Sequence, residues 1–442
     1  MEQKSVTGKN NNPLENSLEK NATQRHFRFF YSLERVILLW KMGFKEWLFI
    51  VPTLILIGIF SLWPVFQSLT YTFFDYRLND QQKAGLYLNE RFNVDLYKET
   101  SLYVSMFLDE DLPKVTDSED QEKIQGIKER LAATGKQYET EKGVIKISRD
   151  QRDEVSALHK DAEELVDSLN GKYTVIHKDD LPALVDDIQN SIIPSNFIGL
   201  KGYAKLLTDD RVGKALWNTT IFTVVSVFIE LVLGIGLALI LNKAMFGQGL
   251  VRTTSLIPWA IPTAVAAMMW SYLYNGSSGI VAYVFENIGL IEQSQDLLLS
   301  GPGAMASSIF ADVWKTTPYM ALLLLAGLQN IPKSLYEAGA IDGAGKIQSF
   351  FRITLPLLKP SILVALLFRT LDAFRVFDLI FVLTGGGPGG DTETLSIYAY
   401  KVMFGQTNFG YGSILVMLMF ICVAIIAILF VRFLGTNLME KN

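Results

Sequence analysis

Long apolar runs separated by polar segments extend along most of the 442-residue chain. A helix rises about 1.5 Å per residue, so a run of about 20 residues can cross the hydrocarbon core of a bilayer. Six runs reach that length, at residues 47–69, 217–241, 254–274, 308–328, 362–383 and 414–433. The pattern predicts an all-α polytopic membrane protein. Pro258 and Pro262 fall inside the third run, which should therefore be kinked.

A polar stretch at residues 75–205 separates the first two runs and is rich in Asp, Glu and Lys. The spacing of apolar residues predicts helices at 119–133 and 150–169, and strands are expected at 143–148 and 172–177. We therefore expect a small α/β domain on the extracytoplasmic side, because long domains are translocated largely regardless of their charge. Two interpretations remain open, a solvated insertion and a module that binds a partner protein.

Basic and aromatic residues are mixed in the segment before the first run. Residues 25–45 carry too many charges to span, so an interfacial helix on the inner leaflet is favoured, with a poorly hydrophobic extra span as the alternative. Residues 1–24 are polar and are not expected to be a cleavable signal. The predicted organisation is a cytoplasmic segment 1–45, a first span 46–74, the insertion 75–205, a membrane core 206–434 and a cytoplasmic tail 435–442.

The positions of Lys and Arg predict the orientation of the spans. Residues 275–305, after the third run, contain neither residue type, and residues 384–413, after the fifth, contain only Lys401. Basic residues gather in the alternate loops, at Lys243, Arg252, Lys333, Lys346, Arg352, Lys359, Arg432 and Lys441. Because cytoplasmic loops are enriched in Lys and Arg, both termini and residues 330–360 are expected in the cytoplasm.

Composition excludes several kinds of chemistry. Cys422 is the only cysteine, and the three histidines, His26, His159 and His177, are scattered along the chain. Neither a disulfide nor a thiolate or histidine metal site is therefore expected. No lysine completes a G-x-x-x-x-G-K-[ST] loop, so ATP would have to be hydrolysed by a separate protein. We expect no cofactor, no metal, no nucleic-acid partner and no enzymatic activity in the chain itself.

Residues 337–360 are a polar, glycine-containing segment between the fourth and fifth runs. A short helix should include Glu337 and be interrupted by Gly343, and Pro356 is compatible only with a first helical turn or a kinked entry. We expect two short amphipathic helices at the membrane surface, with one face free to dock against another protein. The segment matches the pattern Glu-Ala-Ala, three residues, Gly, nine residues, Ile-x-Leu-Pro, except that Gly339 replaces the second Ala.

In this pattern the chain resembles the permease subunits of binding-protein-dependent ABC importers. The resemblance implies that the segment couples transport to a partner ATPase through Glu337, Ala338, Gly339, Asp342, Gly343, Ala344, Ile353, Leu355 and Pro356. Gly339 keeps its position small, so close helix packing should survive with some loss of helix propensity. ATP-driven closure of the partner would move the segment as a lever and rock the attached spans.

Three further segments, at residues 199–220, 257–270 and 383–395, resemble the carbohydrate-uptake branch of these permeases, which includes maltose and glycerol-phosphate importers. The resemblance covers residues 197–434 and implies a six-helix permease core in a bacterial cytoplasmic membrane, carrying an oligosaccharide of the maltose or maltodextrin type. It also implies a second homologous permease subunit, two copies of an ATP-binding subunit and an extracytoplasmic sugar-binding protein as partners. The insertion is similar to that of the larger permease subunit of maltose importers, where it is associated with contacts to the sugar-binding protein.

Charged residues inside the apolar runs are candidates for a substrate pathway. One such residue at the centre of a span costs about 2.5–3.5 kcal/mol on insertion scales. Arg369 and Asp372 are spaced to pair on one helix face, and Arg375 and Asp378 repeat that spacing. These residues either line a polar pathway or join spans as structural ion pairs. The candidate pathway residues are Trp314, Lys315, Tyr319, Arg369, Asp372, Phe374 and Phe377, whereas Trp270 is expected to anchor a span at the membrane interface.

Other classes of function compete with this interpretation. A secondary transporter would work without an ATPase and would need no docking segment, and an importer of the same family could carry a solute other than a sugar. An intramembrane enzyme is disfavoured, because the spans contain no Ser/His, His-Glu-x-x-His or paired-Asp signature. The glycine-rich residues 384–390 are expected to form a flexible outside loop that meets the delivering protein or closes the pathway.

Overall fold

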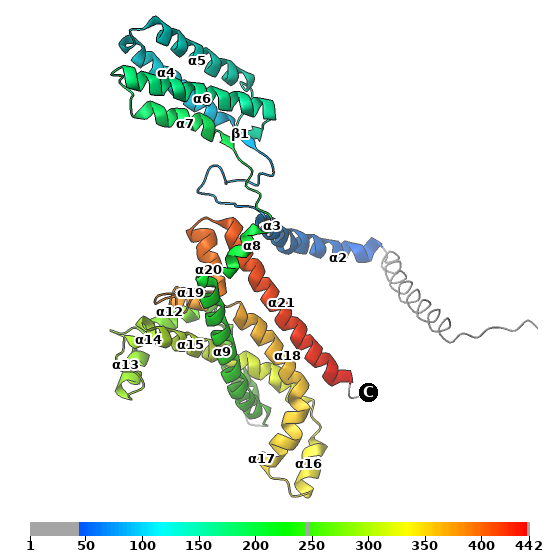
Figure 1. The fold of residues 1–442 in the computed structure, drawn as a ribbon. Helices are drawn as coiled ribbons and strands as arrows, with labels where there is room; N and C mark the ends of the chain where they lie inside the picture. The colour runs from blue at the N-terminus through cyan, green and yellow to red at the C-terminus, as the bar shows by residue number, and fades with distance from the viewer. Residues whose placement is uncertain (1–43, 244–246, 440–442) are drawn as a thin grey trace, which may run out of the picture. The chain divides into compact units, whose positions relative to one another are not determined.

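The computed structural model describes residues 44–243 and 247–439, with side chains at 49–243 and 247–433. The chain divides into two units, Met1–Ser68 and Leu69–Asn442, and Figure 1 labels their elements. Four helices among the described residues are long and apolar enough to cross a membrane: Phe49–Tyr71, Asp210–Asn242, Lys346–Phe374 and Phe409–Phe433. The predicted all-α polytopic architecture is confirmed.

The first apolar helix is nearly continuous. It comprises α2 (Phe44–Ile57), a π-helical turn η1 (Gly58–Leu62) and α3 (Trp63–Tyr71). Pro52 lies inside α2 without ending it. An apolar helix of this length is typical of a membrane span. The first predicted span corresponds to a helix that is long and apolar enough to cross a membrane, Phe49–Tyr71, whereas the interfacial helix predicted at 25–45 lies outside the described residues up to position 43.

Four helices and a three-stranded antiparallel sheet form the insertion (Figure 1). The helices are α4 (Val94–Asp111), α5 (Ser118–Gln137), α6 (Arg149–Lys172) and α7 (Asp180–Asn190). The strands β1 (Arg91–Asn93), β2 (Val144–Lys146) and β3 (Ile192–Ile193) are arranged in the order β2-β1-β3. Phe92 in the central strand pairs with Ile145 and Ile192 and is fully buried. The predicted α/β insertion is confirmed and has its own hydrophobic core.

Most of the predicted elements of the insertion are present. The helices predicted at 119–133 and 150–169 correspond to α5 and α6, and the strand predicted at 143–148 contains β2. The strand predicted at 172–177 is wrong. Helix α6 continues to Lys172, and the backbone amides of Ile176 and His177 then donate to the Asp111 carboxylate at 2.6 and 3.3 Å. A side chain therefore occupies donors that a strand would have used.

Three long helices form the centre of the membrane core: α9 (Asp210–Asn242), α15 (Gly301–Gln329) and α18 (Leu355–Phe374). They approach one another closely at two glycines. A Cβ atom on Gly234 of α9 would lie 2.7 Å from Cγ of Met320 on α15. A Cβ atom on Gly327 of α15 would lie 2.5 Å from Cβ of Ser361 on α18. Small residues at helix contacts let the backbones pack at short distance.

Shorter helices surround this centre, and α21 (Phe409–Met439) packs against α18 and α20. The shorter elements are α8 (Lys201–Ala204), η3 (Lys205–Leu207), α10 (Gln248–Ser255), α11 (Ile257–Ala260), α12 (Thr263–Leu273), α13 (Ile280–Asn287), α14 (Asp296–Leu299), α16 (Lys333–Ile341), α17 (Lys346–Ser349), η4 (Phe350–Thr354), α19 (Asp378–Leu383), α20 (Leu395–Tyr400) and η5 (Lys401–Gly405).

Two of the predicted spans are broken. The run at 254–274, expected to be kinked, is divided among α10, α11 and α12, and Pro262 lies at the second break. The run at 362–383 is not one helix, because α18 ends at Phe374 and α19 begins at Asp378. The carboxylate of Asp378 lies in the first turn of α19, where negative charge favours the start of a helix. The runs at 217–241, 308–328 and 414–433 lie within α9, α15 and α21.

Candidate functional site

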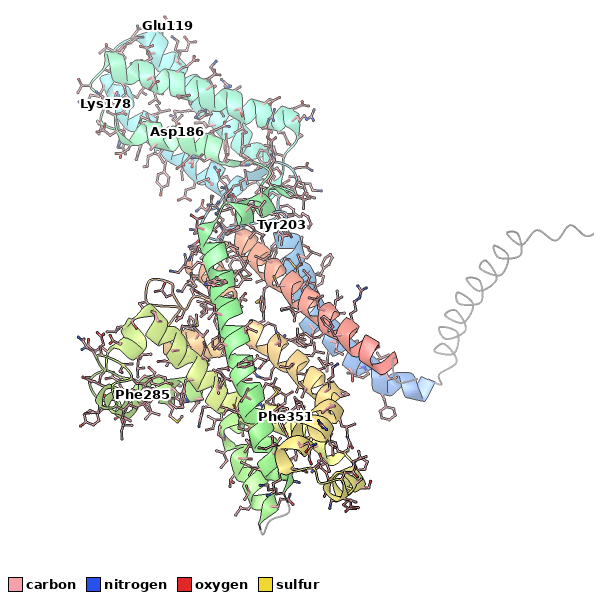
Figure 2. The ribbon with its side chains drawn as sticks, turned by 60° about the horizontal axis from the view of Figure 1, so that its bottom comes forward. Glu119, Lys178, Asp186, Tyr203, Phe285 and Phe351 are labelled. Atoms are coloured by element: carbon pink, nitrogen blue, oxygen red, sulfur yellow. The ribbon has the colours of Figure 1, made fainter. Side chains whose placement is uncertain are left out.

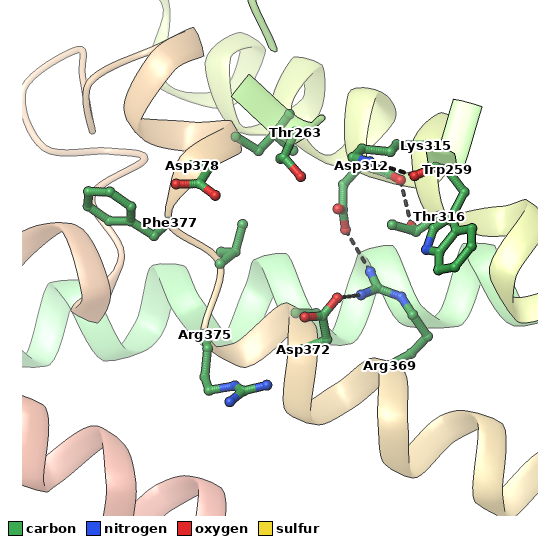
Figure 3. Close-up of a pocket in the computed structure, with 13 residues that line it drawn as sticks. Trp259, Thr263, Asp312, Lys315, Thr316, Arg369, Asp372, Arg375, Phe377 and Asp378 are labelled. Atoms are coloured by element: carbon green, nitrogen blue, oxygen red, sulfur yellow. Dashed lines mark hydrogen bonds and ion pairs between the residues drawn. The ribbon is translucent and has the colours of Figure 1, made fainter. Parts of the chain in front are cut away.

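Arg369 lies at the centre of an ion cluster that joins α9, α15 and α18. Its Nε and Nη2 donate to the two carboxylate oxygens of Glu230 at 2.5 and 2.7 Å. Nη2 also donates to Oδ2 of Asp312 at 2.9 Å, and Nη1 donates to Oδ2 of Asp372 at 2.7 Å. The side chains of Arg369 and Glu230 are 1% and 0% exposed. Figure 3 shows the guanidinium of Arg369 between Asp312 and Asp372.

Thr316 completes this group of residues, called the Arg369 cluster below. Its hydroxyl lies 2.7 Å from Oε1 of Glu230 and 2.6 Å from the carbonyl oxygen of Asp312, and can donate to either. The pairing of Arg369 with Asp372 confirms the spacing argument from the sequence. Glu230 and Asp312 were not predicted as partners of Arg369, although each is a charge inside an apolar run. A charge inside an apolar run was the sequence signal that could have identified them as partners.

The second predicted ion pair is wrong. Residues 375–377 are not helical, so Arg375 and Asp378 do not share a helix face. The Nε of Arg375 donates instead to the carbonyl oxygen of Leu371 at 3.0 Å, which lies in the last turn of α18. Figure 3 shows the side chain of Arg375 directed away from Asp378.

A cavity of about 230 Å³ lies beside the Arg369 cluster (Figure 3). It is lined by Trp259, Thr263, Asp312, Lys315, Thr316, Arg369, Asp372, Ala373, Arg375, Val376, Phe377, Asp378 and Leu379. Carboxylates accept hydrogen bonds from hydroxyl groups, and aromatic rings offer flat apolar faces. The lining therefore suits a polar, hydroxylated solute. Of the candidate pathway residues, Lys315, Arg369, Asp372 and Phe377 line this cavity.

Lys315 holds the break between α11 and α12. Its Nζ donates to the carbonyl oxygens of Trp259 and Ile261 at 3.1 and 2.7 Å. These carbonyls lie at the C-terminal end of α11, where the last helical turn leaves carbonyl groups without intrahelical partners. An ammonium group has three donors, so Lys315 positions the wall of the cavity with two of them and has one further donor.

The remaining candidate pathway residues do not line this cavity. The ring of Trp314 lies 5.4 Å from that of Trp270, and Tyr319 stacks at 5.3 Å on Trp259, a residue of the cavity wall. Phe374 lines a separate apolar groove with side chains of α9 and α21. Trp270 is 7% exposed and belongs to the main hydrophobic core, so the prediction of an interface anchor is wrong.

Residues 333–360, called the coupling segment below, form the predicted pair of short helices. Helix α16 ends at Ile341, Gly343 turns the chain with φ +80°, and α17 follows. The turn η4 then leads into α18, with Pro356 in its first turn. The hydroxyl groups of Tyr336 on α16 and Thr354 on η4 lie 3.0 Å apart and join the two arms. The turn at Gly343 and the place of Pro356 agree with the local prediction, whereas the contact between Tyr336 and Thr354 was not predicted.

Gly339 packs against the second arm of the coupling segment. A Cβ atom there would lie 3.1 Å from Cδ1 of Ile353 and 3.8 Å from Cβ of Ala344. The backbone amide of Ala344 donates to the carbonyl oxygen of Gly339 at 2.8 Å. The close packing expected at this position is therefore present, and an alanine would fit after a small shift of the Ile353 side chain.

The outer face of the coupling segment is exposed. Ile341, Ile347 and Phe351 are 87%, 77% and 61% exposed, and Figure 2 labels Phe351 among the side chains of this segment. Glu337 is exposed and has no ion pair or hydrogen bond to another side chain among the described residues. The predicted coupling residues fall into two groups by exposure. The exposed ones are Glu337, Ala338, Asp342, Gly343 and Pro356, and the half-buried ones are Gly339, Ala344, Ile353 and Leu355. Exposed apolar residues around an unpaired carboxylate are typical of a protein-docking surface.

The glycine-rich loop is hydrogen-bonded to α9, a contact that the sequence did not predict. Lys214 Nζ donates to the carbonyl oxygen of Gly389 at 3.0 Å, and Asn218 Nδ2 donates to that of Gly390 at 3.0 Å. Both donors lie in the first turns of α9. The loop at 384–390 is therefore held against the start of a long helix.

Glu393 strengthens this anchorage. Its carboxylate accepts two hydrogen bonds from Arg211 at 2.6 and 2.8 Å and one from Lys401 at 2.9 Å. Burial disfavours the charged form, but the hydrogen bonds from Arg211 and Lys401 outweigh it and lower the pKa of Glu393 below its ordinary value. Glu393 is therefore ionised in the folded protein near neutral pH.

The chain matches one protein family and several curated relatives. The family model described as "Binding-protein-dependent transport system inner membrane component" matches residues 230–439. The match includes α15, α18 and the coupling segment and does not include the insertion.

The relatives are permease proteins. The trehalose/maltose transport system permease protein MalF of Thermococcus litoralis is 44% identical over 236 residues, which cover 53% of this chain and 79% of that protein. The sulfoquinovosyl glycerol transport system permease protein SmoG of Agrobacterium fabrum is 40% identical over 246 residues, covering 55% and 79%. The trehalose transport system permease protein SugA of Mycobacterium tuberculosis is 44% identical over 241 residues, covering 54% and 75%. The chain belongs to the family of inner membrane components of binding-protein-dependent transport systems.

Proposed function

We propose that the chain is a permease subunit of an ATP-driven importer for a sugar, most closely an oligosaccharide of the trehalose, maltose or maltodextrin type. The exposed coupling segment, with the Glu337 pattern on an outward face, is the observation that carries this proposal. Relatives named as trehalose/maltose, trehalose and sulfoquinovosyl glycerol permeases support a sugar as the solute. ATP would be hydrolysed by a separate subunit, because the sequence has no P-loop.

The coupling segment is proposed to dock into a cleft of an ATP-binding subunit, one of two copies in the assembly. Glu337 would pair with an Arg or Lys of that subunit through charge-assisted hydrogen bonds. The exposed apolar side chains of Ile341, Ile347 and Phe351 would be buried around it. Gly339, Ala344, Ile353 and Leu355 would keep the two arms rigid, so that displacement of the segment moves α15 and α18.

The cavity beside the Arg369 cluster is proposed to be part of the solute pathway. Asp372 and Asp378 are exposed carboxylates on its lining and would accept hydrogen bonds from sugar hydroxyls. Phe377 would contact an apolar face of a sugar ring, and the remaining donor of Lys315 would reach a hydroxyl. Trp314, Tyr319 and Phe374 would act behind the wall or outside it. A volume of about 230 Å³ suits one sugar unit at a time, so a second, homologous permease subunit would supply the facing wall for a longer solute.

The insertion is proposed to contact the extracytoplasmic sugar-binding protein. Leu102, Tyr103 and Met106 on α4 are 69%, 42% and 42% exposed. Residues at positions i, i+1 and i+4 can share one side of a helix, and an exposed apolar group of this kind is more typical of an interaction surface than of a solvated insertion. In this arrangement the insertion faces outward, and both chain termini and the coupling segment face the cytoplasm of a bacterium, as the Lys and Arg distribution suggests.

The proposal is tested by purifying the assembly that copurifies with the tagged chain and reconstituting it in proteoliposomes. We expect ATP hydrolysis that rises when a solute-binding protein is added with trehalose, maltose or maltotriose, and ATP-dependent uptake of the same sugar. An amino acid added with the same preparation serves as the control solute. Uptake that continues without ATP and without a copurified ATPase would instead identify a secondary transporter, and stimulation by the amino acid alone would overturn the assignment to sugars.

A further inference from the structure

The Arg369 cluster does more than pair two neighbouring charges. It is the point at which three helices are joined by ionic hydrogen bonds: α9 through Glu230, α15 through Asp312 and α18 through Arg369. Every nitrogen of the guanidinium donates to a carboxylate of this chain. Arg369 therefore has little capacity left for a solute, although it borders the cavity.

The coupling segment is connected to two of these three helices. It follows α15 at Lys333 and continues into α18 at Leu355. The contact between Gly327 and Ser361 packs α15 against α18 near that end. Arg369 lies eight positions after Ser361, which is about 12 Å along the helix. A displacement of the coupling segment thus reaches Arg369 through two packed helices.

Helix α9 has no backbone connection to the coupling segment. It meets α15 at Gly234, whose backbone lies against Met320, and it meets Arg369 through Glu230. An ionic contact in an apolar interior resists sliding, because separation would leave a buried charge without a partner. The contact between Glu230 and Arg369 is therefore an ionic contact that opposes sliding of α9 along α18.

Regular helical structure ends just beyond the cluster. α18 stops at Phe374, five residues after Arg369, and α11 and α12 are separated at Ile261 and Pro262. Lys315, three residues after Asp312 on α15, holds the carbonyl oxygens at that second break. The cluster thus lies between three closely packed helices and two broken segments that line the cavity.

We propose that the Arg369 cluster is a clamp that makes α9, α15 and α18 one moving body, so that motion of the coupling segment reaches the cavity wall. This inference rests on the proposed function. Arg369 is a positioning residue in this account: it contacts neither ATP nor the sugar, and it acts through Glu230 and Asp312.

The test uses a variant that removes the buried charges of the cluster together, Glu230→Gln with Asp312→Asn and Arg369→Met, and leaves only the exposed Asp372 without its partner. Replacing a buried ion cluster by uncharged groups of similar volume is often compatible with folding. In the reconstituted assembly we expect ATP hydrolysis within about twofold of wild type and uptake per ATP reduced by about tenfold or more. Gly236→Ala, at an exposed position of the same helix α9 with open space around it, is the matched control and should keep the wild-type ratio.

A distance measurement separates a clamp from a merely stabilising contact. Spin labels at Asn242→Cys on α9 and Lys359→Cys on α18, both exposed, are introduced into a Cys422→Ser background. In the wild-type cluster the distance should be the same without nucleotide and in the ATP-trapped state. In the triple variant it should broaden or shift between the two states.

The outcomes distinguish the inference from the function on which it rests. Absence of ATP-dependent uptake in the wild type overturns both. Two outcomes overturn the clamp alone when the wild type shows ATP-dependent uptake. The first is a triple variant that keeps the wild-type uptake per ATP and a single narrow distance between the spin labels. The second is a wild-type distance that changes between the two states. If the triple variant does not assemble, Arg369→Lys decides, because lysine keeps the charge and loses the two-pronged contact with Glu230. A wild-type ratio in Arg369→Lys overturns the clamp, and uncoupling supports it.

Discussion

The Arg369 cluster and the coupling segment both place charged residues beside apolar helices, and they are built in opposite ways. Arg369 is 1% exposed and all its nitrogens are bonded within the chain. Glu337 is exposed, and Ile341 beside it is 87% exposed. A buried charge needs its partners in the same chain, because it cannot be left unpaired in an apolar interior. An exposed, unpaired charge among apolar residues is available to another protein.

Removing one charge of the buried cluster should have the largest effect on stability. Arg369→Met leaves Glu230 and Asp312 buried without a cation, which should reduce the free energy of unfolding by about 3–5 kcal/mol. Glu337→Ala should change it by no more than about 0.5 kcal/mol, since the side chain is on the surface. Thermal unfolding of the two detergent-solubilised variants measures both effects. Equal stability of the two variants would mean that the cluster is not held as described.

Overpacking at a helix contact should have the next largest effect. Gly327→Val would drive a side chain into Ser361 and Leu358 of α18, and such insertions cost about 1–3 kcal/mol. Gly236→Ala on α9, with nothing within 4 Å of the added Cβ atom, is the control and should change stability little. The same thermal unfolding assay applies, and a Gly327→Val protein as stable as the control would rule out close packing of α15 on α18.

Backbone strain in the coupling segment should destabilise this segment locally and leave the rest of the fold unchanged. Gly343 has φ +80°, a conformation that β-branched residues rarely adopt, so Gly343→Val should cost about 1–3 kcal/mol locally. Gly345→Ala, at φ −73° and with open space around its Cβ position, should be tolerated. Hydrogen exchange of residues 333–354 should rise only in Gly343→Val. Unchanged exchange there would mean that the turn does not need glycine.

The smallest effect concerns acid in the insertion. Hydrogen bonds from Lys172 and Tyr173, opposed by burial, lower the pKa of Asp120 below its ordinary value of 3.8. A carboxylate with a depressed pKa stabilises the fold above its unfolded pKa, and that contribution is lost as the pH falls through the folded pKa. Protection of α5 against hydrogen exchange should therefore be constant from neutral pH down to about 4 and fall below it. In Lys172→Met the loss of protection in acid should be smaller, because the pKa of Asp120 then differs less between the folded and unfolded states, and coincident profiles would exclude this ion pair as the cause.

Local features of the coupling segment could be predicted from sequence because they depend on residues close in the chain. Gly343 requires a positive φ and Pro356 requires a first helical turn, and both constraints act over a few residues. The Arg369 cluster could be predicted only in part. Spacing identified Asp372, three residues away, whereas Glu230 is 139 positions distant and meets Arg369 only because Gly234 and Gly327 let three helices pack closely.

The wrong predictions have the same origin. A helix was assumed to continue through Arg375 to Asp378, but the chain leaves the helix after Phe374, and no periodicity argument registers such a break. The strand predicted at 172–177 had suitable residues, yet Asp111, more than sixty positions earlier, takes its backbone donors. Tertiary contacts decide such cases, and a single sequence does not contain them as a local pattern.

Binding of the coupling segment to an ATP-hydrolysing subunit is the central claim, and one measurement tests it most directly. ATP hydrolysis and sugar uptake are measured together in proteoliposomes for the wild type and for Glu337→Ala, with Glu292→Ala, an exposed acid distant in sequence, as the control. We predict that the Glu337→Ala protein still inserts into the membrane and that its sugar uptake falls by about tenfold or more. The Glu292→Ala protein should take up sugar at the wild-type rate. Wild-type uptake in the Glu337→Ala protein would contradict the account.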